Sequence, residues 1–228
     1  MSETDHPPSD YLTRVREAVL AAALVHVPFD GWSETVFQNA VRDAGVDAGR
    51  ALLAFPGGAM DLLDTFWASN DMALAKEIAG RGLDNTPVSQ RISKALEIYL
   101  DLLRPHREAV RRALALQALP PHAPGALAML YRTVDTIWRS VGDQSTDYNF
   151  YTKRAVLAAV VMSVVTNWLG ESGDDAAAMK AFIGRRIGNV LAFEKVKARV
   201  AGVIQSAPSP APLLGRLVGR LTGIRHSL

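Results

Sequence analysis

Residues 33–58, SETVFQNAVRDAGVDAGRALLAFPGG, decide the fold of this chain. Ser33 can cap a helix that runs to about Ala44, because its hydroxyl can accept a hydrogen bond from a first-turn amide. Gly45 stops that helix, and a short helix then spans roughly residues 47–54 before a Pro-Gly-Gly stop. Two helices joined by a tight glycine turn predict a helix-turn-helix.

The rest of the chain carries the helical period almost everywhere, and no stretch alternates convincingly like a strand. Further helices are expected over residues 12–27, 59–80, 87–103, 105–119, 125–141, 147–169 and 174–204. Prolines and glycines close most of them, including a rigid break at residues 120–124. The sequence therefore predicts an all-α fold, with about nine helices in one domain over residues 11–206.

The first three helices, within residues 11–58, have the layout of a TetR-type helix-turn-helix, whose third helix would enter the major groove of DNA. Residues 33–56 carry two cations against three acids, namely Arg42 and Arg50 against Glu34, Asp43 and Asp47. Duplex binding draws most of its strength from phosphate neutralisation. Nucleic-acid binding is therefore disfavoured, and a TetR-type regulator that senses a small apolar ligand remains the alternative function.

Composition narrows the class of protein further. The chain has 228 residues, 49% of them hydrophobic, which is ample for a buried core. Zero cysteines exclude disulfides, thiolate metal sites and cysteine nucleophiles. Residues 1–10 are polar, without the apolar core of a secretory signal, and are expected to be a disordered lead-in. The longest charge-free apolar segment, residues 155–170, is shorter than the roughly 20 residues that a membrane span needs.

Residue patterns for catalysis are weak in this sequence. The only Glu-x-x-His pair, Glu3 and His6, lies in the polar lead-in, whereas a di-iron site needs two such pairs on helices. Neither a phosphate-binding glycine loop nor a Gly-x-Ser-x-Gly elbow is present. Asp143 and Asp147 lie four residues apart, but they fit helix caps and partner contacts better than a catalytic pair. We therefore expect that the chain is not an enzyme and that it has no catalytic residue, metal ligand or cofactor.

Residues 142–155, GDQSTDYNFYTKRA, contain the clearest candidate contact surface. The polar half indicates a helix start, because Ser, Thr and Asp side chains can accept hydrogen bonds from first-turn amides. Tyr148, Phe150 and Tyr151 follow in the first turns, where three aromatic side chains cannot all face one core. Open aromatic surface marks contact sites. A plain N-cap followed by core aromatics is the competing interpretation.

The C-terminal residues 213–228 have the pattern of an amphipathic helix, joined through a stiff Pro-rich linker at residues 207–212. At 100° per residue, its apolar side chains fall within an arc of roughly 140°. Arginines border that arc and could extend to lipid phosphates. The predicted membrane-binding residues are Leu213, Leu214, Arg216, Leu217, Val218, Arg220, Leu221 and Ile224. Docking of this helix on its own domain or on a neighbouring protomer remains open.

Several of these stretches resemble the Coq-nine family of ubiquinone-biosynthesis accessory proteins. The similarity is most specific in residues 142–155, and it extends to residues 27–32 (VPFDGW), 134–138 (VDTIW) and 221–224 (LTGI). The resemblance implies a TetR-like fold turned into a lipid binder, a homodimer, and a terminal helix that engages membrane. It also implies a patch that contacts the demethoxyubiquinone hydroxylase. With the neighbouring Asp143 added, the candidate partner-binding residues are Asp135, Ile137, Asp143, Asp147, Phe150 and Tyr151.

Two of these positions depart from the family's commoner pattern. Ile137 stands where Met is usual, and Phe150 stands where Trp is usual; both substitutions keep bulk and apolarity, although Phe150 lacks the indole donor. The function expected is a non-enzymatic accessory protein that binds an isoprenoid lipid or quinone precursor in a hydrophobic cavity. It would engage the membrane surface and present substrate to the hydroxylase. The expected location is cytoplasmic, peripheral on a bacterial inner membrane.

Overall fold

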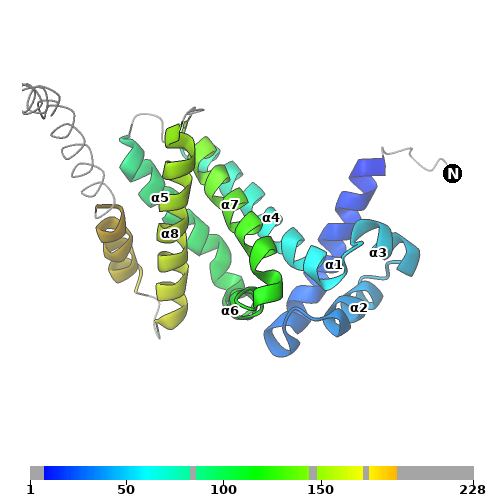
Figure 1. Cartoon of the computed structure of the whole chain (residues 1–228). Helices are drawn as coiled ribbons and strands as arrows, with labels where there is room; N and C mark the ends of the chain where they lie inside the picture. Colours follow the sequence, from blue (N-terminus) through cyan, green and yellow to red (C-terminus); the bar gives the residue numbers. More distant parts are fainter. Residues whose placement is uncertain (1–7, 83–85, 144–147, 172–174, 189–228) are drawn as a thin grey trace, which may run out of the picture. The chain divides into compact units, whose positions relative to one another are not determined.

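The computed structural model describes residues 8–82, 86–143, 148–171 and 175–188, shown in Figure 1. Within these ranges every regular element is a helix and none is a strand. The elements are α1 (Pro8–Asp30), α2 (Glu34–Asp43), α3 (Ala48–Ala54), α4 (Ala59–Gly80), α5 (Val88–Leu103), η2 (Arg104–His106), α6 (Arg107–Gln117), η3 (Pro120–His122), α7 (Ala123–Ser140) and α8 (Tyr148–Gly170). Residues 176–188 are also helical.

The N-terminal helices form the predicted helix-turn-helix. Ser33 caps α2, since its Oγ accepts from the Val36 amide at 3.3 Å. Gly45 adopts a φ of 63° in the turn that follows, a conformation that other residues rarely adopt. Asp47 caps α3, because its Oδ1 accepts from the amides of Gly49 and Arg50 at 3.0 and 3.3 Å. The Ser33 cap is the one that the sequence indicated, and the Asp47 cap is seen only in the structure.

Proline explains two of the differences between the observed helix boundaries and the sequence-based expectation. We expected α1 to close at Pro28, but it continues to Asp30 and ends where the Gly31 amide donates to the Val27 carbonyl at 2.9 Å. A proline near a helix end removes one hydrogen bond without preventing the last turn. The seventh helix begins at Ala123, earlier than expected, because Pro124 fits its first turn, where an amide has no intrahelical partner.

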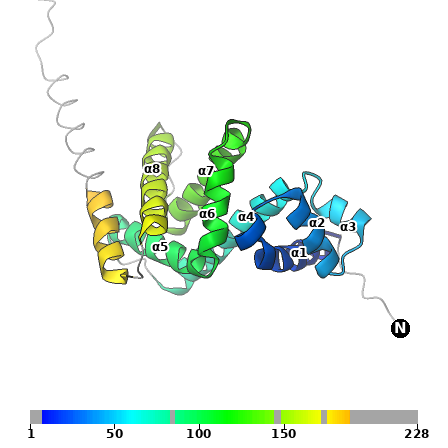
Figure 2. The ribbon, with the colours of Figure 1, turned by 90° about the horizontal axis from the view of Figure 1, so that it is seen from below.

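Helix α4 connects the helix-turn-helix to the remaining helices (Figures 1 and 2). It contacts α1 and α2 as well as α5 and α7, while α7 also packs on α8. Large aromatic side chains fill the first part of this core: the rings of Trp32 and Phe66 lie 5.2 Å apart, and those of Phe66 and Trp67 lie 5.1 Å apart. Trp32 Nε1 donates to the Ala109 carbonyl at 2.9 Å, which fixes α6 against the N-terminal helices.

The last described helix buries one side, with Met179, Ile183 and Ile187 at four-residue spacing. It matches the first part of the predicted ninth helix. None of the helices in the described ranges is both long and apolar enough to cross a membrane. The predicted lead-in covered residues 1–10, but residues 8–10 belong to α1. Residues 1–7, the Pro-rich linker and the amphipathic segment 213–228 lie outside the described residues.

Candidate functional site

A cavity of about 300 Å³ lies among α4, α5, α6, α7 and α8. Most of its lining is aliphatic or aromatic, contributed by Trp67, Tyr99, Leu114, Gln117, Ala118, Ala123, Ala126, Leu127, Met129, Leu130, Thr133, Val161, Met162 and Val165. The α7 residues follow three- and four-residue spacings, so they form one face of that helix. Alanines at three lining positions keep side-chain volume low where the helices meet. An apolar space of this size is suited to a small hydrophobic ligand.

The cavity has a buried floor and an exposed mouth. Trp67, Tyr99 and Thr133 are buried and form the floor. Leu127 at 66% and Met162 at 37% exposure lie at the mouth. Because large apolar side chains remain in contact with water there, the mouth offers an apolar rim to an incoming ligand.

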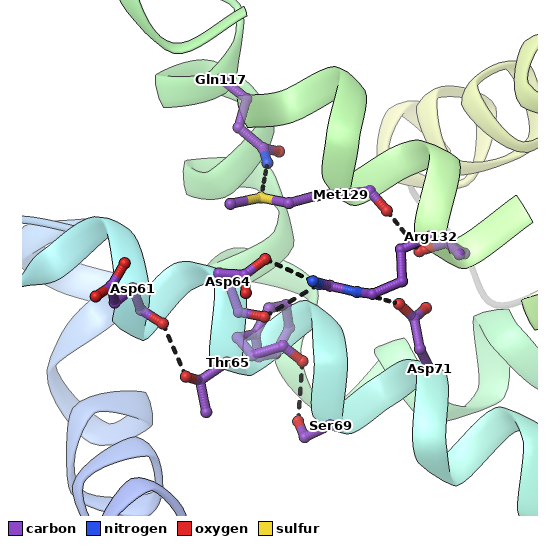
Figure 3. Close-up of polar contacts among 10 residues, drawn as sticks. Asp61, Asp64, Thr65, Ser69, Asp71, Gln117, Met129 and Arg132 are labelled. Carbon is purple, nitrogen blue, oxygen red and sulfur yellow. Dashed lines mark hydrogen bonds and ion pairs between the residues drawn. The ribbon is translucent and has the colours of Figure 1, made fainter. Parts of the chain in front are cut away.

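An ion-pair cluster beside the floor ties α7 to α4 (Figure 3). Arg132 lies between two carboxylates, with Nη1 at 2.7 Å from Asp64 Oδ1 and Nε at 3.1 Å from Asp71 Oδ2. Burial raises the pKa of Asp71, although hydrogen bonds with Thr133 and Arg132 oppose that shift. Burial also raises the pKa of Tyr99, and the nearby Thr133 hydroxyl opposes that shift. Thr133 Oγ1 donates to the Met129 carbonyl at 3.3 Å.

Gln117, the last residue of α6, is half-buried in the cavity wall. Its Nε2 donates to Met129 Sδ at 3.0 Å, a contact that Figure 3 shows between α6 and α7. A thioether sulfur is a weak acceptor. The amide is therefore held in place by an interaction much weaker than a bond to oxygen would be.

A second cluster of charges joins α7 to the start of α8. Arg154, with 2% of its side chain exposed, donates through Nε and Nη2 to Asp135 Oδ1 at 2.8 and 2.7 Å. Arg154 Nη1 also lies 3.4 Å from Asp143 Oδ2. Lys153 Nζ pairs with Asp143 at 2.9 Å, and Arg139 Nε pairs with Asp135 at 2.6 Å. Burial of the Arg154 charge is tolerated because Asp135 and Asp143 carry the opposite charge beside it.

The predicted partner-binding residues differ in their exposure. Ile137 is fully buried and packs in the core between the helices, so its contact with a partner stays a prediction that its burial does not favour. Asp135 and Asp143 turn toward Arg154 instead of facing outward, which makes them anchors for the surface above them. Tyr151 does project from α8, with 68% of its side chain exposed. Asp147 and the side chain of Phe150 lie outside the described residues.

The helix equivalent to a DNA-reading helix presents an apolar surface. Leu52 and Leu53 of α3 are exposed by 65% and 72%. Arg50, the cation within α3, lies over the Tyr11 ring at 5.4 Å. This arrangement leaves α3 poorly equipped for phosphate contacts. Within the ranges that the structure describes, no group of three or more His, Cys, Asp or Glu side chains is placed to hold a metal ion.

Sequence reasoning missed both the lining of the cavity and the Arg132 cluster. Part of the signal was present, because Asp64 and Asp71 are seven residues apart and lie on one face of α4. Their partner on α7 becomes apparent only once the two helices are packed. The alanines at 123 and 126 were equally visible, but an alanine stripe fits close helix packing as well as a cavity.

Comparison with known proteins identifies similar sequences and a similar fold. Residues 123–194, from the start of α7 onward, match the COQ9 family model. The chain is 27% identical to the ubiquinone biosynthesis protein COQ9 of Rattus norvegicus, over 90% of this chain and 69% of that protein. It is 29% identical to COQ9-A of Xenopus laevis, over 90% of this chain and 68% of the relative. The resemblance seen in the sequence is thereby confirmed.

Among solved structures, the fold is similar to that of a TetR transcriptional regulator from Nitrosomonas europaea. The two superpose with a TM-score of 0.62 and 18% identity, over 77% of this chain and 97% of the other. The expected TetR-like all-α fold is confirmed.

Proposed function

We propose, from its resemblance to COQ9 proteins, that this chain is a non-enzymatic accessory protein of ubiquinone biosynthesis that binds an isoprenoid quinone precursor in the cavity among α4–α8. The observation that carries the proposal is the cavity itself, an apolar space of about 300 Å³ with an exposed apolar rim. Each methylene that a ligand buries contributes about 0.8 kcal/mol. A few isoprene units would therefore supply useful affinity without any polar contact.

The surface at the start of α8 supports a second part of the proposal, contact with the demethoxyubiquinone hydroxylase. Tyr151 offers exposed aromatic area, the kind of side chain enriched at protein interfaces. Arg154, Asp135 and Asp143 hold the backbone beneath it. A rigid aromatic contact loses little conformational freedom on binding. Presentation of a bound precursor to the active site of another enzyme would then require no catalytic group in this chain.

Membrane engagement and dimerisation complete the proposal. The segment 213–228, with its arginine-edged apolar stripe, would place the protein on an anionic bilayer surface, where its substrate resides. The protein would act as a homodimer bound peripherally to a bacterial inner membrane. The support for these points is the sequence pattern together with the COQ9 resemblance.

Lipid extraction from the purified full-length protein tests the central point. We expect native mass spectrometry and organic extraction to recover an isoprenoid lipid. Ala126→Trp, which fills the cavity, should lower the bound lipid at least about tenfold. Ala128→Trp is the matched control, because Ala128 is exposed on α7 and does not line the cavity. Equal lipid in both variants, or no lipid and no quinone binding by the unaltered protein, would overturn the proposal.

A TetR-type regulator that senses a small apolar ligand is the second candidate, favoured by the structural similarity to such a regulator. A mobility-shift assay at moderate salt separates the two. The accessory function predicts only weak binding that is independent of sequence, because α3 exposes leucines where a repressor presents phosphate-binding and base-reading side chains.

A further inference from the structure

The cavity wall contains one side-chain amide, that of Gln117, among lining residues that all lie in the described part of the chain. The other polar lining groups are the hydroxyls of Tyr99 and Thr133, which are buried at the floor, and Thr133 donates to the Met129 carbonyl at 3.3 Å. Gln117 differs from them, because it is half-buried and directs its Nε2 to the Met129 sulfur. Exchanging a sulfur acceptor for an oxygen acceptor strengthens a hydrogen bond.

We propose that Gln117 selects the ligand of this cavity by donating a hydrogen bond to a ring oxygen, carbonyl or methoxy, of a lipid with a polar head. This inference rests on the proposed lipid-binding function and specifies which chemical class the site prefers. A bound head group would replace Met129 as the acceptor for Nε2. A pure hydrocarbon offers no hydrogen-bond acceptor, so the Gln117 amide would keep its hydrogen bond to the Met129 sulfur.

The position of Gln117 also sets the orientation of the ligand. It ends α6, next to the exposed Ala118 at the mouth, whereas Trp67 lies buried at the floor. A head group held by Gln117 stays near the mouth while the first isoprene units enter the floor. The reactive ring would then face outward, where another protein can reach it.

Calorimetric titration of the full chain with two probes tests the inference. One probe is a benzoquinone carrying two isoprene units, and the other is a terpene hydrocarbon of similar length without oxygen. Gln117→Leu should weaken quinone binding about 5- to 10-fold, the equivalent of a hydrogen bond of about 1 kcal/mol. Binding of the hydrocarbon should stay the same or tighten.

Two further variants keep the result interpretable. Gln117→Glu, which replaces the amide donor with a carboxylate, should also weaken binding of the quinone. Gln90→Leu, at an exposed α5 position away from the cavity, should leave both probes unaffected. Equal losses for the two probes in the Gln117 variants, or unchanged quinone affinity, would overturn the role of Gln117. Failure of the unaltered protein to bind either probe would instead overturn the proposed function on which it rests.

Discussion

Arg154 of α8 donates from Nε and Nη2 to a single oxygen, Asp135 Oδ1 of α7, at 2.8 and 2.7 Å. The same guanidinium reaches Asp143, which follows α7, so one buried cation holds the two helices together across the residues that separate them. Arg139 and Lys153 also pair with these carboxylates, but both are far more exposed than Arg154, so Arg154 is the buried charge that compensates them. The surface that carries Tyr151 thus depends on a charge cluster beneath it.

Replacing Arg154 with Met should lower the free energy of unfolding by about 3 kcal/mol, because it removes the buried cation that Asp135 and Asp143 share and leaves each carboxylate with only a more exposed partner, Arg139 or Lys153. Urea denaturation followed by circular dichroism measures this change. Arg139→Met is the control, since that side chain is mostly exposed and its pair with Asp135 should contribute at most about 1 kcal/mol. Similar losses in the two variants would contradict the buried-anchor interpretation.

The double variant Phe150→Ala, Tyr151→Ala should keep its stability but lose the complex with the demethoxyubiquinone hydroxylase. Tyr151 is mostly exposed, so its removal leaves no cavity in the core. Co-purification of the two proteins measures the complex. Tyr131→Ala, at another exposed tyrosine, is the matched control and should retain it. An intact complex together with normal ubiquinone levels would exclude this surface as the contact.

The raised pKa of Asp71, caused by burial, predicts a particular pH dependence of stability. The folded state holds this proton more tightly than the unfolded state does, so the contribution of Asp71 to stability falls as pH rises from about its ordinary value of 3.8 toward the folded-state pKa. The difference in free energy of unfolding between the unaltered protein and Asp71→Asn should therefore change with pH across this window. Lowering the pH should stabilise the unaltered protein relative to the variant. A difference independent of pH would show that the carboxyl titrates alike in both states.

The helix-turn-helix and the locations of the helices could be predicted from the sequence, because caps such as Ser33 and Asp47 act within one turn of their own residue. The predicted partner residues differ in exposure, since Tyr151 projects into solvent and Ile137 is buried. A resemblance gives the position of a residue in the sequence and not the direction of its side chain. The cavity and the Asp64–Arg132–Asp71 cluster form only when α4 and α7 pack together. Arg132 lies 61 or more residues from its two carboxylate partners in the sequence. Local patterns do not encode such pairings.

Removal of residues 207–228 should abolish binding to anionic vesicles and leave the unfolding of the remaining chain unchanged. The segment carries Arg216, Arg220 and Arg225 with no acid, so its attraction to the surface is electrostatic as well as apolar. Sedimentation with vesicles at low and high salt measures both contributions. Unchanged binding by the truncated protein would assign membrane contact to another surface, such as the exposed leucines of α3.

The affinity for isoprenoid quinones should stop increasing after the first few isoprene units. A volume of about 300 Å³ lies at the lower end of the range for drug-sized ligands, roughly 300–1,000 Å³. A long isoprenoid tail therefore cannot be enclosed, and only about three units should gain burial. Titration with quinones of one to eight units should give affinities that rise steeply and then level off. A constant gain per unit up to the longest chain would mean that the helices separate to admit the whole tail, and the cavity would then have to be larger when occupied.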